Sequence, residues 1–189
     1  MQEYYVVEYS GTFGFIKPWT AVRDEKTFSQ QFLTPSILEG IRQKLGVTAI
    51  FRHKLMHAGT SLQQERTQSR AFLEKRKGAF KEAARTLSII SRGIMLYPHL
   101  WLAFPSQADA ELAAEQHTCL SRNEDILLPS PEISTITEAE FDQMPGFELR
   151  FGKTPASILV GHNRYEDNVP MYGEIIITGN PILDLSLEL

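Results

Sequence analysis

One continuous segment, residues 51–92, carries more than half of the chain's basic residues. It holds ten of the nineteen Lys and Arg residues and three acids, so its net charge is +7 in a protein of net charge −4. A local excess of this size attracts polyanions such as nucleic acid. Aromatic residues are few in the segment, which favours contact with phosphates over a row of stacked bases. The alternative is a solvated charged surface, the commoner meaning of a charge run.

The middle of this segment also constrains the fold. Residues 58–81 show little hydrophobic periodicity and are rich in Gln, Ser, Lys and Arg. A polar excursion of this length inside a compact domain is usually functional or unstructured. We therefore expect it to leave the core as a hairpin or a loop.

Strands and short helices are predicted on both sides of the basic segment. Residues 3–10 carry Tyr and Val on both faces and predict an interior strand. Thr34, Pro35 and Gly46 are cap-type residues that bound an amphipathic helix. Gly40 inside that helix costs about 1 kcal/mol relative to alanine, which predicts close packing of its face. Further strands are expected at 47–57, 86–97 (interrupted at Gly93), 100–104, 147–151, 156–160, 172–178 and 182–187, with a helix over 109–117, a loop over 120–131 and one helical turn over 138–143.

This order of elements favours an α+β protein with a mainly antiparallel sheet. Two successive strand–helix–strand blocks are typical of a ferredoxin-like (RRM-like) core. A length of 189 residues suits one domain, which we assign to residues 1–189.

The composition excludes several kinds of site. Cys119 is the single cysteine, so a disulfide within the chain and a zinc site with two cysteines are both impossible. The five histidines show no H-E-x-x-H spacing, and neither a metal nor a cofactor is expected. No apolar run of about 18 residues occurs, and the first residues lack a signal-peptide pattern, so we expect a cytoplasmic protein with no membrane segment.

Histidines in the basic segment raise the question of catalysis. His53 and His57 flank Lys54. A histidine can act as general acid or base in a metal-independent ribonuclease, and a lysine can stabilise the charged intermediate. The sequence fixes no second base, and Walker, Rossmann and G-x-S-x-G motifs are absent. We therefore expect a binding protein without catalytic residues and keep the ribonuclease as an alternative.

Three stretches of the N-terminal half are similar to motifs of one known family. In the first, EYYVVEYSG leads into GTFGFIKP, which resembles the glycine–aromatic–basic–proline motif of the Cas five family of CRISPR-associated RAMP proteins, with Lys17 where arginine is common. FLTPSILEGI is similar to the family's proline-headed helix with an internal glycine. EAARTLSIISRGIMLYPHLWLAF is similar to its arginine-led strand after a basic insertion. Together these stretches cover roughly residues 2–104.

The resemblance implies a ferredoxin-like fold with a projecting basic β-hairpin thumb at residues 58–85. It also implies a non-catalytic subunit of a type I Cascade surveillance complex in antiviral defence. Such a subunit caps the 5′ handle of the CRISPR RNA, contacts the backbone and large subunits, and lies near target DNA. One subtype cleaves precursor RNA with a Tyr–Lys–His set, whereas the order His53–Lys54 is reversed here. Two alternatives stay open: a metal-independent RAMP endoribonuclease, and a protein–protein adaptor whose basic segment meets an acidic partner.

The residues expected to hold RNA fall into three groups. Lys17 and Trp19 follow the first strand and would supply a charge and a stacking ring. A second group lies at a strand end where the handle would enter, and a third lies on the thumb as phosphate contacts. The second group is Arg52, His53, Lys54 and His57; the third is Arg66, Arg70, Lys75, Arg76, Lys77, Lys81 and Arg85.

Overall fold

The computed structural model describes the chain apart from residues 1, 19–25, 67–71, 77, 84–88, 121, 164–165 and 184–189. For residues 72–76 and 79–83 it describes the backbone alone. The helices of the described part are α1 (Pro35–Leu45), α2 (Gln107–Ala114) and α3 (Glu138–Gln143). Its strands are β1 (Glu3–Ser10), β2 (Phe13–Gly14), β3 (Lys26–Phe28), β4 (Arg52–Met56), β5 (Gly59–Arg66), β6 (Phe72–Arg76), β7 (Ala79–Ala83), β8 (Ile89–Leu96), β9 (His99–Phe104), β10 (Thr118–Cys119), β11 (Ile126–Thr137), β12 (Gly146–Phe151), β13 (Ile158–Asn163) and β14 (Val169–Thr178).

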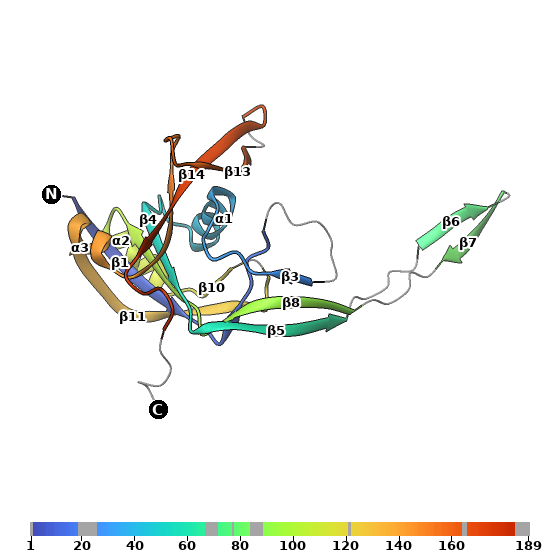
Figure 1. Cartoon of the computed structure of the whole chain (residues 1–189), viewed down its shortest axis with the longest axis horizontal. Coiled ribbons are helices and arrows are strands. Elements are labelled where there is room, and N and C mark those ends of the chain that lie inside the picture. Colours follow the sequence, from blue (N-terminus) through green and yellow to red (C-terminus); the bar gives the residue numbers. More distant parts are fainter. Residues whose placement is uncertain are drawn as a thin grey trace.

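The main sheet contains eight of these strands, in the order β10-β11-β1-β9-β4-β12-β14-β13, and all of its neighbours pair antiparallel. The prediction of an α+β protein with a mainly antiparallel sheet is therefore confirmed (Figure 1). β1 lies inside the sheet between β11 and β9, as its large apolar side chains on both faces predicted. β4 and β12 share a short ladder, whose described register pair is Phe147 with Leu55.

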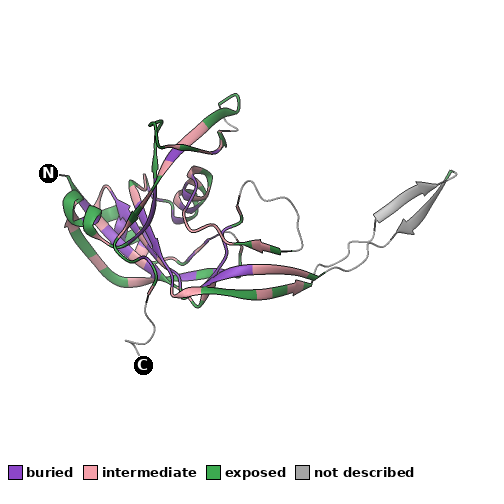
Figure 2. Ribbon diagram, in the orientation of Figure 1, coloured by how far each residue is buried: buried purple, intermediate pink, exposed green. Residues whose placement is uncertain are grey.

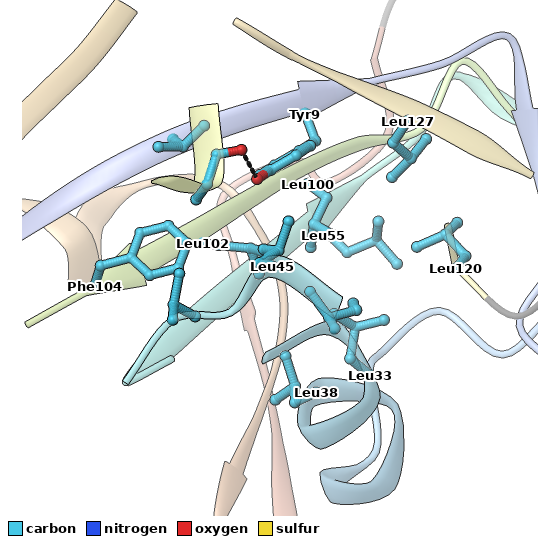
Figure 3. Packing of buried hydrophobic residues seen from close by; sticks show 14 of the residues in the cluster. Tyr9, Leu33, Leu38, Leu45, Leu55, Leu100, Leu102, Phe104, Leu120 and Leu127 are labelled. Atoms are coloured by element: carbon cyan, nitrogen blue, oxygen red, sulfur yellow. Dashed lines mark hydrogen bonds between the residues drawn. The ribbon is translucent and has the colours of Figure 1, made fainter. Parts of the chain in front are cut away.

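Helices α1 and α2 cover one face of the main sheet. α1 begins at Pro35 after the N-cap Thr34 and ends at Gly46, whose φ of +70° is a conformation that glycine adopts freely. The apolar stripe of α1 and the alanines of α2 pack on side chains from β1, β4 and β9 (Figure 3). The Tyr9 hydroxyl donates to the Ala113 carbonyl at 2.6 Å, so a buried hydrogen bond also joins β1 to α2.

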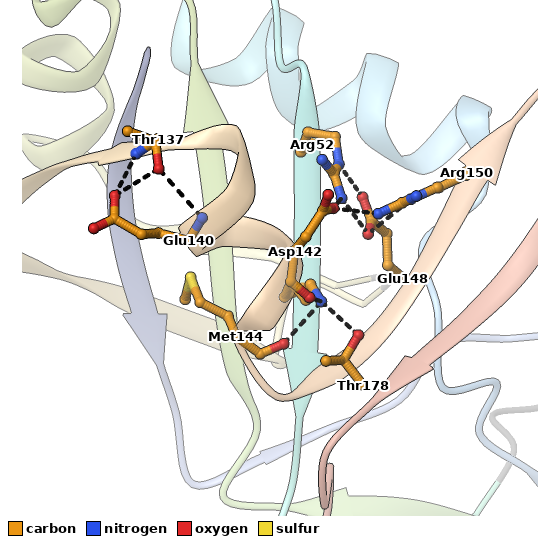
Figure 4. A network of polar contacts seen from close by, with 9 residues as sticks. Arg52, Thr137, Glu140, Asp142, Met144, Glu148, Arg150 and Thr178 are labelled. Atoms are coloured by element: carbon orange, nitrogen blue, oxygen red, sulfur yellow. Dashed lines mark hydrogen bonds and ion pairs between the residues drawn. The ribbon is translucent and has the colours of Figure 1, made fainter. Parts of the chain in front are cut away.

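Helix α3 covers part of the opposite face, which we call the α3 face. Phe141 is fully buried there against Tyr4, Val6 and Ala103. The helix begins with a capping box, in which the Thr137 hydroxyl accepts from the Glu140 amide and the Glu140 carboxylate accepts from the Thr137 amide (Figure 4). The helical turn predicted over 138–143 is thus confirmed, and its cap and aromatic anchor hold it in place.

A second sheet is built on β8. β2 and β3 pair with one edge of β8, and β5 pairs with the other edge from Gly59–Leu96 to Arg66–Ile89. We call the β5–β8 pair the arm, and Figure 1 shows it leaving the main sheet. Side chains along β5 are mostly exposed (Figure 2). β6 and β7 form a two-stranded sheet of their own, with Arg76 opposite Ala79.

The prediction of a loop over residues 120–131 is wrong, because strand β11 begins at Ile126. Pro129 and Pro131 suggested turns, since proline removes a ladder hydrogen bond from a central strand. The described ladder between β10 and β11 ends at Leu127. Beyond that point the outer edge of β11 has no described neighbour, so its prolines interrupt no ladder there.

Two glycines also behave differently from the expectation. β8 runs through Gly93 without interruption. A Cβ atom at Gly93 would lie 2.1 Å from Cδ1 of Phe28, so the glycine makes room for that ring. Close packing at Gly40 was expected, but no described heavy atom lies within 4 Å of the position of a Cβ there, so that prediction is wrong.

Smaller differences lie at the ends of elements. The helix expected over 109–117 is α2, which begins earlier because Ser106 Oγ accepts from the Asp109 amide at 3.2 Å. The strand expected over 47–57 begins at Arg52. From the strand expected over 182–187, Ile182 makes an isolated bridge to His57, and positions 184–187 lie outside the described residues. No described helix has the length and apolarity needed to cross a bilayer.

Candidate nucleic-acid interface

The basic segment falls largely on the arm and on the hairpin β6–β7. Arg66 ends β5 and is exposed, and Lys17 is exposed near the end of β2. Lys75 and Arg76 belong to β6 and Lys81 to β7, for which the backbone register is described. Outside the described residues lie Arg70, Lys77, Arg85 and Trp19.

Paired cations fix the arm to the rest of the molecule near the far end of β5. Arg122 makes hydrogen bonds of 2.6 and 2.8 Å to the buried carboxylate of Asp125, and it lies 3.8 Å from Glu65 of β5. Arg92 of β8 pairs with Glu65 at 2.5 Å. Both guanidinium groups lie over the ring of Phe15, at 5.1 and 5.5 Å from its centroid. Charge and an aromatic ring therefore hold the arm near Glu65, one residue before the end of β5.

Arg52 was expected at an accessible strand end, but it lies on the α3 face within a cluster of charges (Figure 4). Its Nη2 atom is 2.7 Å from Oε2 of Glu148 and 2.8 Å from Oδ1 of Asp142, and its Nε also donates to Glu148. Arg150 pairs with the same two carboxylates. Burial opposes the charged form of Arg52, but the hydrogen bonds that it donates to Glu148 and Asp142 outweigh this effect and raise the pKa of the guanidinium.

Lys54 lies on the same face and is fully buried. Its Nζ donates to the Met144 carbonyl at 2.8 Å and to the Thr178 hydroxyl at 2.9 Å. Burial lowers the pKa of Lys54. The side chain thus joins β4 to the end of α3 and to β14, and its donors are used inside the protein.

The two histidines of this segment are buried on the other face. His53 stacks on Phe151, with ring centroids 6.3 Å apart, and its Nε2 accepts from the Leu149 amide at 3.4 Å. Burial lowers the pKa of His53 to about 4. His57 stacks on Phe147 at 6.0 Å, and burial lowers its pKa too.

The side chains of Arg52, His53, Lys54 and His57, which were expected to contact RNA, have little exposed surface. Lys54 and the two histidines are buried, and the side chain of Arg52 is 13% exposed, because β12 and α3 pack beside β4. Their hydrogen bonds and ring contacts hold the sheet together. The ribonuclease alternative depended on the same His–Lys grouping, whose members are buried on opposite faces of β4.

The sequence analysis did not identify one pair of half-buried rings on the α3 face. His99 and Trp101 of β9 stack with ring centroids 5.8 Å apart and planes 25° apart. Nδ1 of His99 is 2.6 Å from Oε1 of Glu8 on β1. The signal was the alternation in HLWLAF, which places His99 and Trp101 on one face and the leucines on the other.

The described residues contain no group of three His, Cys, Asp or Glu side chains that could hold a metal ion. Comparison with known protein families finds no matching family, and comparison with curated proteins finds no matching protein.

Proposed function

We propose that the protein binds single-stranded RNA through a cationic finger made of the arm and the hairpin β6–β7. Charge is the observation that carries the proposal, because residues 66–85 hold seven Lys and Arg and two Glu. Four of these seven cations belong to described strands: Arg66 to β5, Lys75 and Arg76 to β6, and Lys81 to β7. The net charge of this segment contrasts with the acidic remainder of the chain, which repels a polyanion.

The arm suits such a role physically. Its β5 edge is polar and exposed, while Arg122, Arg92 and Phe15 hold it near the far end of β5. A fixed arm lowers the conformational entropy lost when RNA is bound, which favours affinity. Within the described residues Arg66 and Lys17 remain exposed cations for phosphate. The proposed contact set is Lys17, Trp19, Arg66, Arg70, Lys75, Arg76, Lys77, Lys81 and Arg85.

The central part of the main sheet supports a ferredoxin-like core within the proposal. Its strands β11, β1, β9 and β4 are neighbours in that order. α1 lies in sequence between β1 and β4, and α2 between β9 and β11. This is the β-α-β-β-α-β sequence of two interleaved strand–helix–strand units. RNA-binding domains of that general form hold single strands by phosphate contacts and by unstacked bases.

The resemblance to the Cas five family gives the proposal its setting. The protein would be a non-catalytic subunit of a cytoplasmic type I Cascade complex. Its finger would hold the 5′ handle of the CRISPR RNA, and its body would contact the backbone and large subunits near target DNA. Support for this setting is the resemblance over residues 2–104, together with the charge of the finger.

The salt dependence of RNA binding tests the proposal. Fluorescence anisotropy with a labelled single-stranded repeat RNA, repeated at several salt concentrations, gives the slope of log K against log salt. Each phosphate contact contributes about −0.7 to this slope for single strands. The variant Arg76→Glu/Lys77→Glu should bind more weakly, and its slope should be shallower by about 1.4.

A matched variant, Lys44→Glu/Lys153→Glu, makes the same change of charge at two exposed positions outside the finger. It should keep most of the affinity and the slope of the wild type. Equal slopes for the wild type and the finger variant would refute the proposal. Cleavage of the RNA in the presence of EDTA would favour the endoribonuclease over the RNA-binding proposal. If a protein partner, and no RNA, stayed bound after nuclease treatment, the adaptor would be favoured.

A further inference from the structure

We infer that the open part of the α3 face binds one unpaired nucleobase, stacked on the Trp101 and His99 rings. This inference rests on the proposed function, because the RNA held by the finger supplies the base. Sequential bases of single-stranded nucleic acid stack readily on aromatic side chains, since every base has a π face. A strand of bases needs a flat, partly exposed aromatic surface close to the phosphate contacts.

The rings form such a surface. Trp101 and His99 are both half-buried, and their ring planes differ by 25°. They lie two residues apart on β9, an interior strand of the sheet. Because the two rings stack on each other, a base would add to this stack on an outer ring face.

Neighbouring strands hold the platform in a fixed orientation. Glu8 of β1 lies opposite Trp101 in the register, and its Oε1 is 2.6 Å from Nδ1 of His99. The imidazole is thereby held before a ligand arrives, which reduces the rotamer entropy lost on binding. The partly exposed carboxylate of Glu8 can also accept a hydrogen bond from an N–H group of the base.

The side of the platform away from α3 is formed by His99. Trp101 packs against the buried cluster around Phe141, whereas His99 lies two residues farther along β9 from that cluster. Ser10 pairs with His99 on one side and with Leu128 on the other, so Leu128 lies on the same face, and it is 62% exposed. An exposed leucine therefore lies on the same face as the rings, on β11, with Ser10 of β1 between them.

The platform also lies next to the base of the arm. β8 ends at Leu96, and residues 97 and 98 lead directly to His99. Tyr97 in this turn is exposed and has a φ of 46°, which is uncommon for a residue other than glycine. Strained backbone of this kind is concentrated at ligand sites. An RNA strand that follows the arm toward the main sheet would reach the rings at this turn.

Trp101→Leu tests the inference, since leucine keeps the apolar bulk and removes the π face. Its control is Phe51→Leu, which removes another exposed ring outside the platform. Both are titrated with single-stranded repeat RNA and with RNAs that carry one abasic position at a time. For the wild type and Phe51→Leu, one abasic position should weaken binding about fivefold to a hundredfold. For Trp101→Leu the intact RNA should bind with this lower affinity, and the same abasic position should cause no further loss.

Fluorescence adds a readout that does not depend on the stability of the variant. The chain has two tryptophans, so a Trp19→Phe protein reports on Trp101 alone, and RNA should quench its emission while the abasic RNA should not. The salt slope should be the same for Trp101→Leu and the wild type, because no phosphate contact is removed. Salt-dependent RNA binding without quenching, and with equal affinity for Trp101→Leu, would overturn the inference and leave the proposed function standing. Absence of RNA binding by the wild type would overturn both.

Discussion

Replacement of Glu148 by alanine should destabilise the protein strongly, because it removes the carboxylate that balances Arg52 inside the sheet. Glu148 is 1% exposed, and the side chain of Arg52 is 13% exposed. Arg52 bonds Glu148 through both Nε and Nη2. Without Glu148 the guanidinium would keep the bond of Nη2 to Asp142 but lose both of these partners.

The magnitude follows from the burial of the pair. Removal of one partner of a buried ion pair costs about 3–5 kcal/mol, because the other charge stays desolvated and unpaired. Asp142 remains as a half-exposed partner, so we expect the lower end, about 3 kcal/mol. For a chain of this size that corresponds to a fall in Tm of about 6–12 °C.

Thermal unfolding followed by circular dichroism measures the effect. The control is Glu39→Ala on α1, which breaks the Glu39–Arg42 pair on the protein surface, and it should move Tm far less. The double variant Arg52→Met/Glu148→Leu should be more stable than Glu148→Ala, because it leaves no unpaired charge behind.

Two outcomes would contradict this reasoning. Equal falls in Tm for Glu148→Ala and Glu39→Ala would mean that water screens the cluster. If Arg52→Met lowered RNA affinity and flattened the salt slope without a change in Tm, Arg52 would be an RNA contact after all.

A fall in pH and substitutions of two glycines give further tests of stability. As the pH falls from 6.5 toward 4, His53 takes up a proton in the unfolded chain but stays neutral in the folded protein, so the free energy of unfolding should fall by up to about 3 kcal/mol. Urea unfolding at pH 7 and pH 4.5 measures this loss, and His53→Gln should remove the part that is due to His53. A pH dependence that His53→Gln leaves unchanged would argue against a buried neutral imidazole. Gly40→Ala should raise stability by about 1 kcal/mol, because the Cβ position is open. Gly46→Ala should lower stability by about 1 kcal/mol, because the φ of Gly46 is +70°. Shifts of Tm in the same direction for the two glycine variants would refute this reasoning.

Elements with strong local signals could be predicted from the sequence. The Tyr and Val pattern of β1 and the caps Thr34 and Gly46 of α1 depend on residues within a few positions of one another. β11 could not be predicted in this way, because Pro129 and Pro131 resemble a loop locally. Its strand is determined by pairing with β1, from which it is far removed in sequence.

The same limit applies to the candidate site. Arg52 and Lys54 look like surface cations within their own segment. Asp142, Met144 and Glu148 are their partners and come much later in the chain. No local sequence pattern indicates that these groups meet on one face of the sheet. The platform of His99 and Trp101 was visible as an alternation, but its fixed imidazole depends on Glu8 from a distant strand.

The position of β1 has a consequence for how the protein is made. The ribosome synthesises β1 well before its two neighbours, β9, which ends at Phe104, and β11, which ends at Thr137. Until β9 has been made, a strand rich in Tyr and Val has no partner on either edge. Pairings this distant slow folding and leave apolar edges open to other nascent chains. Yield during expression should therefore depend on temperature and chaperones more than on the final stability of the sheet.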